Sequence, residues 1–330
     1  MDNLTHTLVG AALGQAGLKR RSGLAMPALM IAANIPDVDI VCALAGQGLS
    51  GRRGWTHGPV GLVVLPLLLT GALILFDRRQ ARRGTRPDAR PVVRPGALLA
   101  ISYVGALSHP LLDLMNNWGI RLLMPFSERW FYGDTLFIAD PWIWSCLAVG
   151  IWLSRRREAG GRSAVAVPAG VSLAITILYS AAMSAGGRVA EARAADAFHA
   201  RHGEDPQRVL ASPVFADPFR RQIIIQSGDR YVFGEVNFLA RTQVSLGTPL
   251  ATGLSDPAVA DAQKQDSAAA DFLYWSRFPI ADVRRALGAA IVHLGDARFG
   301  QKPGSGPIGA VVTIPDRLDR GGDATSPKPR

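Results

Sequence analysis

The chain has few cysteines for its length: only two among 330 residues, Cys42 and Cys146. Both lie in apolar stretches, which excludes a disulfide framework or a cysteine-rich zinc ribbon and favours a packing role for each thiol. Aromatic residues make up only 7% of the chain, and no basic helix with interleaved aromatic residues occurs. A nucleic-acid partner is therefore not expected, despite a formal net charge of +10.

The start of the chain lacks a basic cluster ahead of its first apolar stretch, so we expect no cleavable signal peptide. Charge is also absent from residues 59–76 and 164–186. Each segment has roughly the 20 apolar residues needed to cross the hydrocarbon core of a bilayer, so both predict membrane spans. Residues 4–18 are apolar but short and predict either a half-inserted helix or a sixth span. Three further apolar stretches predict spans: 23–45, 97–118 and 141–154.

These stretches predict a mainly α fold, with an integral-membrane bundle of five or six helices over residues 1–186. The pattern then changes to short β-like runs. We expect a small extramembrane α+β domain over 187–317 and a disordered tail over 318–330. Within the domain, helices are predicted over 187–211 and 256–274, and strands over 221–226, 231–236, 277–284 and 288–295.

Positive charge is concentrated in the first half. Residues 1–190 carry 19 lysines and arginines against 10 aspartates and glutamates. The excess falls in three short segments between apolar runs, residues 19–21, 78–94 and 155–157. The positive-inside rule places all three in the cytoplasm. The sequence thus predicts a multi-pass protein of the bacterial inner membrane, with the C-terminal domain outside the cytoplasm.

Six ionisable side chains lie in or beside the apolar stretches, although such groups are costly at membrane depth and mark functional sites there. With the orientation above, their positions converge on the outer leaflet. Histidine and aspartate are also the usual ligands of a hydrolytic metal ion. The six candidate metal ligands are His6, Asp37, Asp39, His57, His109 and Asp113.

The spacing of these residues favours a shared site. His109 and Asp113 are four residues apart, so a helix places both on one face, and Asn117 extends that face by another turn. Pro36 precedes the aspartates at 37 and 39 and disfavours helix at the residue before it. Irregular backbone at membrane depth is tolerated where it lines a cavity. His57 stands just before a predicted span, beside glycines that allow close approach.

Each residue also has a purely structural interpretation. His6 taken alone is more often a hydrogen-bonded core residue than a ligand. The aspartates at 37 and 39 could end a helix at the membrane interface, and the i, i+4 histidine–aspartate pair could form a hydrogen bond without metal. Asp134 and Asp140 flank an aromatic loop and fit ordinary loop or capping roles.

Four short motifs occur in a set order: residues 5–10 (THTLVG), 34–39 (NIPDVD), 53–57 (RGWTH) and 109–113 (HPLLD), with Asn117 and Gly119 beyond. Over about residues 1–186, the chain resembles the membrane-bound metal-dependent hydrolase family, the LexA-regulated inner-membrane hydrolases. The family's third motif reads His-Arg-Gly-x-Thr-His-Ser, whereas Arg52 and Gly58 stand at its first and last positions here. One ligand or phosphate contact of the family is therefore in question. The order of the motifs is also similar, more distantly, to zinc-dependent phospholipase C and S1/P1-type nucleases.

The resemblance and the candidate ligands together predict a metal-dependent hydrolase with one to three divalent ions, zinc above all. The substrate would be an ester or phosphoester, lipid or lipid-linked, reached from the membrane at its outer face. Asp39 is the candidate general base, and Arg53 is the candidate for offsetting charge on a phosphate. A non-catalytic membrane transporter or envelope scaffold is the alternative. The sequence names neither the substrate nor the oligomeric state.

Overall fold

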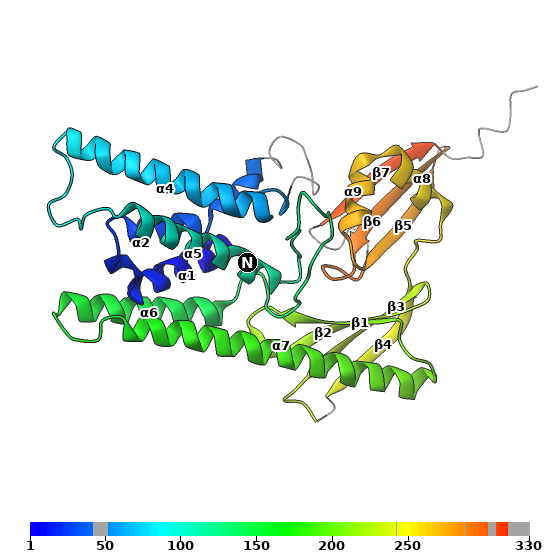
Figure 1. The fold of residues 1–330 in the computed structure, drawn as a ribbon. Coiled ribbons are helices and arrows are strands. Elements are labelled where there is room, and N and C mark those ends of the chain that lie inside the picture. The colour runs from blue at the N-terminus through cyan, green and yellow to red at the C-terminus, as the bar shows by residue number, and fades with distance from the viewer. Residues whose placement is uncertain (42–51, 242, 287, 303–307, 316–330) are drawn as a thin grey trace, which may run out of the picture. The chain divides into compact units, whose positions relative to one another are not determined.

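A computed structural model describes residues 1–41, 52–241, 243–286, 288–302 and 308–315. The chain divides into two compact units (Figure 1). The first unit comprises the described residues up to Ala190 together with Ala211–Arg221. The second comprises Glu191–Leu210 and the described residues from Gln222 onward. The tail expected over 318–330 lies outside the described residues.

The first unit is built from α-helices (Figure 1). Asp2 caps the first helix by accepting hydrogen bonds from two backbone amides, and Asp140 caps α6 in the same way. Proline occupies the first turn of α4, α5 and α6, where a missing backbone amide costs nothing. The helices are α1 (Asn3–Gln15), α2 (Ala25–Ala32), α4 (Pro59–Arg82), α5 (Pro95–Leu114), α6 (Pro141–Ala159) and α7 (Val167–His202), the last of which continues into the second unit.

Among the described residues, three helices are long and apolar enough to cross a membrane: α4, α5 and α7. They match the stretches predicted as spans at 59–76, 97–118 and 164–186. The stretch at 141–154 lies in α6, which is not one of the three, because its last turn is charged. α1 has 13 residues and is about 20 Å long, shorter than a hydrocarbon core of about 30 Å. A half-inserted helix therefore fits α1 better than a full span.

The stretch predicted as a span over 23–45 is not one long helix, and its helix breaks near Pro36, where the sequence predicted irregular backbone. α2 has only eight residues, and a 3₁₀ helix over Ile35–Asp39 follows it. The side-chain amide of Asn34 donates to the carbonyl oxygen of Met30 at 2.8 Å and so satisfies one of the last carbonyls of α2. Pro36 then lacks the amide that would continue the hydrogen-bond ladder. Residues 42–45 lie outside the described part of the chain.

Two glycines let α1 and α5 pack closely against α2. A Cβ on Gly10 would lie 2.8 Å from the carbonyl oxygen of Leu29, and a Cβ on Gly105 would lie 2.9 Å from the same oxygen. Small residues at these points allow helix backbones to approach. Each glycine is one helical turn from a histidine, since His6 precedes Gly10 by four residues and His109 follows Gly105 by four. The close packing therefore brings the two imidazoles together.

The basic segments meet at one end of the first unit. The backbone amide of Arg94 donates to Ser22 Oγ at 2.9 Å, and Lys19 forms an ion pair with Glu158. These contacts join the start of α2, the loop before α5 and the end of α6. Segments that are far apart in the sequence thus share one face, as expected if all three lie on the same side of a membrane.

Two sheets follow α7 (Figure 1). One has four strands in the order β1-β2-β3-β4, and the other is an antiparallel sheet of three strands in the order β5-β6-β7. Two short helices lie between the sheets in sequence. The strands are β1 (Arg208–Val214), β2 (Asp217–Ser227), β3 (Arg230–Asn237), β4 (Val244–Ala251), β5 (Pro279–Ala286), β6 (Ala289–Asp296) and β7 (Gly309–Pro315), and the helices are α8 (Pro257–Gln265) and α9 (Ser267–Trp275).

The expectations for this part of the chain were partly correct. Four predicted strands coincide with β2, β3, β5 and β6. The single helix predicted over 256–274 is two helices, because Asp266 adopts an extended backbone and caps α9 through the amide of Ala269. The helix predicted over 187–211 ends at His202, and its last residues belong to β1. The fold is therefore mainly α only in its first unit.

Candidate metal centre

The candidate ligands converge within the first unit from four separate segments. His6 lies on α1, and Asp37 and Asp39 lie on the 3₁₀ helix after α2. His109 and Asp113 share one face near the end of α5. The remaining ligand, His57, lies in the turn before α4. That turn packs tightly, since a Cβ on the next residue, Gly58, would lie 2.0 Å from the carbonyl oxygen of Met124.

Four of the six side chains can hold one metal ion. Asp37, His57, His109 and Asp113 each offer a ligand atom, and these four atoms lie within 4.8 Å of one another. The two imidazole Nε2 atoms are 3.1 Å apart. Asp37 Oδ1 is 3.6 and 3.7 Å from these nitrogens, and Asp113 Oδ2 is 3.7 and 3.4 Å from them.

Five of the six separations between these atoms are close to those expected around one small metal ion such as zinc. Zinc binds histidine nitrogen and carboxylate oxygen at about 2.0–2.1 Å, which requires about 3.3–3.4 Å between neighbouring ligand atoms in a tetrahedron. The five separations above run from 3.1 to 3.7 Å. Helical spacing and the turn before α4 therefore arrange two nitrogens and two oxygens as a preformed four-ligand site.

The hydrogen bonds of the histidines point their lone pairs into this site. His109 Nδ1 is 2.7 Å from the carbonyl oxygen of Ala33, which only accepts, so Nδ1 carries a proton and, in the neutral ring, the lone pair of Nε2 faces the site. His57 Nδ1 faces the carboxylate of Asp39 at 3.4 Å and Thr56 Oγ1 at 2.9 Å. Burial lowers the pKa of the His57 imidazole, which keeps it neutral at physiological pH. The two Nε2 atoms are 3.1 Å apart, a separation that either a shared proton or a bound cation would stabilise.

His6 adds a further nitrogen beside the four. Its ring stacks on His109 with the centroids 3.9 Å apart, and its Nε2 is 3.4 Å from Asp113 Oδ1. Burial lowers the pKa of His6 to about 4, so the ring is neutral. Neither ring nitrogen has a hydrogen-bond partner among the described residues. Buried polar atoms without partners are costly, and a bound ion would satisfy the ring nitrogen that carries the lone pair.

Asp113 is the most heavily engaged carboxylate. Oδ2 faces the two histidines of the four-ligand group and lies 3.3 Å from Arg53 Nη1, while Oδ1 faces His6 and the amino group of Met1. Its two oxygens therefore point to different neighbours. A carboxylate in this position can bridge two ions.

Asp39 lies on the other side of His57 from the four-ligand group. Asp39 Oδ2 accepts a hydrogen bond from the backbone amide of Arg53 at 2.6 Å and faces His57 Nδ1, while Oδ1 pairs with Arg52 at 3.4 Å. Arg53 has a positive φ of 51°, a conformation that this hydrogen bond helps to hold. A carboxylate behind a ligating imidazole fixes the ring and its tautomer.

Asparagine side chains near the candidate ligands could not be placed correctly from the sequence. Asn117 was expected to extend the face of His109 and Asp113, but α5 ends at Leu114, and the Asn117 side chain donates to Ser212 Oγ instead. The neighbouring Asn116 lies at the centre, where its Oδ1 accepts from the amides of Trp118 and Gly119. The spacing rule fails here because it holds only while the helix continues.

The comparisons with known proteins agree with a membrane location. A model of the YdjM inner membrane protein family matches residues 1–185. The chain belongs to this family. The YdjM match includes all six candidate ligands and the three candidate spans up to residue 185. Family membership and the spans support placement in the inner membrane.

Two curated relatives are similar to the same part of the chain. The inner membrane protein YbcI of Escherichia coli (strain K12) is 29% identical over 186 residues, which cover 47% of this chain and 98% of YbcI. The uncharacterized protein YfhP of Bacillus subtilis (strain 168) is 24% identical over 164 residues. That alignment spans 46% of each chain, so less than half of YfhP is covered. No solved structure matches the chain significantly.

Proposed function

We propose that the protein is a metal-dependent hydrolase of the inner membrane. The observation that carries the proposal is the gathering of Asp37, His57, His109 and Asp113, whose ligand atoms lie within 4.8 Å of one another and include both Nε2 atoms. Two histidines and two carboxylates with their ligand atoms this close together are the donor set that zinc prefers, and a bound ion would offset the loss of hydration on burial. A bound zinc ion would polarise an ester or phosphoryl oxygen and lower the pKa of a coordinated water to about 7.

We infer that the centre holds between one and three ions. The four-ligand group accounts for the first. His6 Nε2 and Asp113 Oδ1, which are 3.4 Å apart, would supply two donors for a second ion, and Asp113 Oδ1 would then exchange its contact with the amino group of Met1 for the ion. The identity of the metal is proposed as zinc because the donors are imidazole and carboxylate in a compact tetrahedron.

Two charged residues support the centre in different ways. Arg53 donates to Gly119 O at 3.1 Å and lies beside Asp113, so its guanidinium is held where it can offset charge that develops on a phosphate or carboxyl oxygen. Asp39 was expected to act as ligand or general base. Its place behind His57 favours an orienting role, because the imidazole ring separates it from the four-ligand group.

The proposed substrate is an ester or phosphoester of a lipid or lipid-linked molecule. Asp37 is the most exposed of the four ligands, with 13% of its side chain accessible against 0% for the others, so access is from its side. Exposed apolar residues of the same segment, Val38 and Ile40, suit an approach from the membrane.

The same geometry supports the proposed orientation. α5 starts next to the basic end of the bundle at Pro95, and His109 lies 14 residues along it, about 21 Å away at 1.5 Å per residue. If the basic end is cytoplasmic, the centre lies toward the outer side of a core about 30 Å thick. A multi-pass arrangement with the C-terminal domain outside the cytoplasm is part of the proposal.

A substrate screen with a metal-free control tests the proposal. The full chain, purified in detergent, is assayed against phospholipid phosphoesters and carboxyl esters with zinc and with chelator. Turnover should require zinc and should be lost in His57→Ala. His199→Ala, an exposed histidine on α7, is the matched control and should keep the wild-type rate. Turnover that persists in chelator would contradict the proposal, and bound metal without turnover on any substrate would favour the scaffold.

A further inference from the structure

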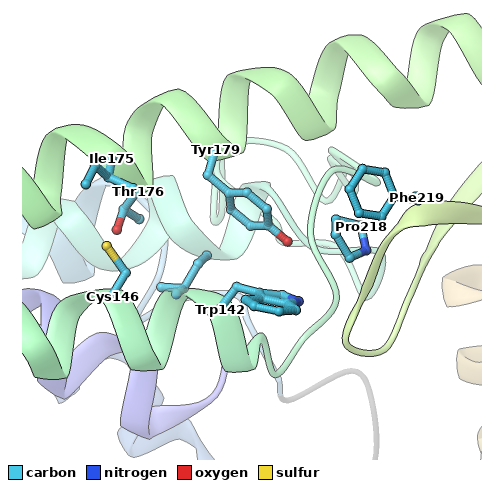
Figure 2. Close-up of a pocket in the computed structure, with 8 residues that line it drawn as sticks. Trp142, Cys146, Ile175, Thr176, Tyr179, Pro218 and Phe219 are labelled. Atoms are coloured by element: carbon cyan, nitrogen blue, oxygen red, sulfur yellow. The ribbon is translucent and has the colours of Figure 1, made fainter. Parts of the chain in front are cut away.

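A pocket in the first unit lies apart from the metal centre, between α6, α7 and the start of β2. Figure 2 shows its lining side chains converging from the two helices and the strand. Its volume is about 420 Å³, within the range of sites for small ligands. The lining residues are Trp142, Ile143, Cys146, Ile175, Thr176, Tyr179, Pro218 and Phe219.

The hydroxyl and indole N–H groups that line the pocket have hydrogen-bond partners within the protein. Tyr179 donates to Asp140 Oδ2 at 3.0 Å, and Trp142 Nε1 donates to the carbonyl oxygen of Ala216 at 3.1 Å. Thr176 Oγ1 bonds to the carbonyl oxygen of Ser172 at 2.9 Å. The wall therefore offers hydrocarbon and aromatic surface but no free donor or acceptor, and a ligand rich in polar groups would lose its hydration without compensation.

The helix that lines one side indicates what fills the pocket. α7 is one of the helices apolar enough to cross a membrane, and Ile175, Thr176 and Tyr179 lie in that apolar stretch. Leu178 on the same stretch is 70% exposed. In a membrane this surface meets lipid chains, so the pocket opens onto hydrocarbon. Trp142 and Tyr179 have the amphipathic rings typical of the headgroup level, which places the polar end of the pocket there.

We propose that this pocket binds one acyl chain of a membrane phospholipid. The chain enters between Trp142 and Tyr179 and extends along α6 and α7 toward Cys146. The site is independent of the proposed hydrolase activity, since none of its lining residues belongs to the metal centre.

Photo-cross-linking tests the proposal. The full chain is placed in phosphatidylethanolamine vesicles that contain a diazirine-labelled phosphatidylethanolamine, irradiated, and mapped by mass spectrometry. The cross-links should fall on residues 142–146 and 175–179 and should be competed by excess unlabelled phospholipid. Ile175→Trp fills the pocket and should abolish them. Ile177→Trp is the matched control, since Ile177 is on the same helix, is 68% exposed and does not line the pocket.

A second measurement does not depend on the folding of a pocket variant. Cys146 lines the pocket, so in a Cys42→Ser background its reaction with N-ethylmaleimide reports access. Added phospholipid should slow this reaction. Equal labelling with and without phospholipid, or cross-links spread evenly over the exposed faces of α4 and α7, would overturn the proposal. Labelling by diazirine-labelled palmitate alone, without phospholipid labelling, would overturn the assignment to a phospholipid.

Discussion

The contact between α5 and α2 at Gly105 makes the most specific prediction about the metal centre. In Gly105→Ala the new methyl group would lie 2.8 Å from Ala32 Cβ and 2.9 Å from the carbonyl oxygen of Leu29. Carbon atoms pack best at about 3.5–4.0 Å, so α5 must move away from α2 by about 0.7 Å or more. Overpacking of this kind costs about 1–3 kcal/mol of stability.

The displacement reaches the centre because His109 is one turn further along α5. Metal–ligand distances tolerate only about 0.2 Å, so a shift of 0.7 Å should weaken zinc binding by about 10–100-fold, as when a residue that orients a ligand is lost. The assay is zinc content after dialysis against graded chelator. Gly71→Ala on α4 is the matched control, because a Cβ there meets no atom within 4 Å. If Gly105→Ala holds zinc as tightly as Gly71→Ala, close helix packing does not set the centre.

Four further predictions concern charged residues and the orientation in the membrane. Arg53→Lys should lower the turnover number and leave the zinc content unchanged, because lysine keeps the positive charge but lacks the planar guanidinium with its paired donors. Loss of zinc in this variant would show that Arg53 has a structural role instead. Asp296 and Arg298 form a fully buried ion pair in the second unit, and Arg298→Met should cost about 3–5 kcal/mol in thermal unfolding of the full chain. Burial alone would raise the pKa of Asp296, but the charge and hydrogen bonds of Arg298 outweigh it and hold the pKa below its ordinary value. The stability that this pair contributes is therefore present above about pH 4 and is lost as the pH falls further. In Asp296→Asn, the free energy of unfolding should depend less on pH in this acid range. An unchanged pH dependence would show that Asp296 is not the titrating group. In intact cells an impermeant maleimide should label Asp229→Cys but not Thr85→Cys, and the reverse pattern would invert the proposed orientation.

The sequence allowed the gathering of four candidate metal ligands to be predicted because their chemistry is independent of the exact fold. Ionisable residues in apolar stretches have few ways to be stable, and pairing around a cation is one of them. The i, i+4 spacing of His109 and Asp113 fixed one edge of the site in advance. The prediction that His57 lies near His109 depended on the predicted direction of the two spans.

The shortness of α2 could not be predicted from hydropathy. An apolar stretch such as 23–45 shows that a segment can be buried, but it does not show that the helix is continuous. The break depends on one side-chain hydrogen bond of Asn34 and on the missing amide of Pro36. The same break places Asp39 behind His57, a position that spacing alone did not predict.

The strands that escaped prediction have weak sequence signals. β4 contains Gly247 and Pro249 and has little alternation of buried and exposed residues. Among the described strands, β4 lies at the end of the order and pairs with β3 alone. An edge strand tolerates proline because one side of it needs no hydrogen-bond donor. Whether such a segment forms a strand depends on its pairing with other strands, which the local sequence pattern does not report.

The most direct test of the central claim is X-ray absorption at the zinc edge on the purified full chain loaded with zinc. The proposed centre requires at least two imidazole nitrogens and carboxylate oxygens at about 2.0–2.1 Å, with the imidazole scattering lost in the His57→Ala, His109→Ala double variant. A spectrum without imidazole scattering, or one that the double variant leaves unchanged, would contradict the metal centre.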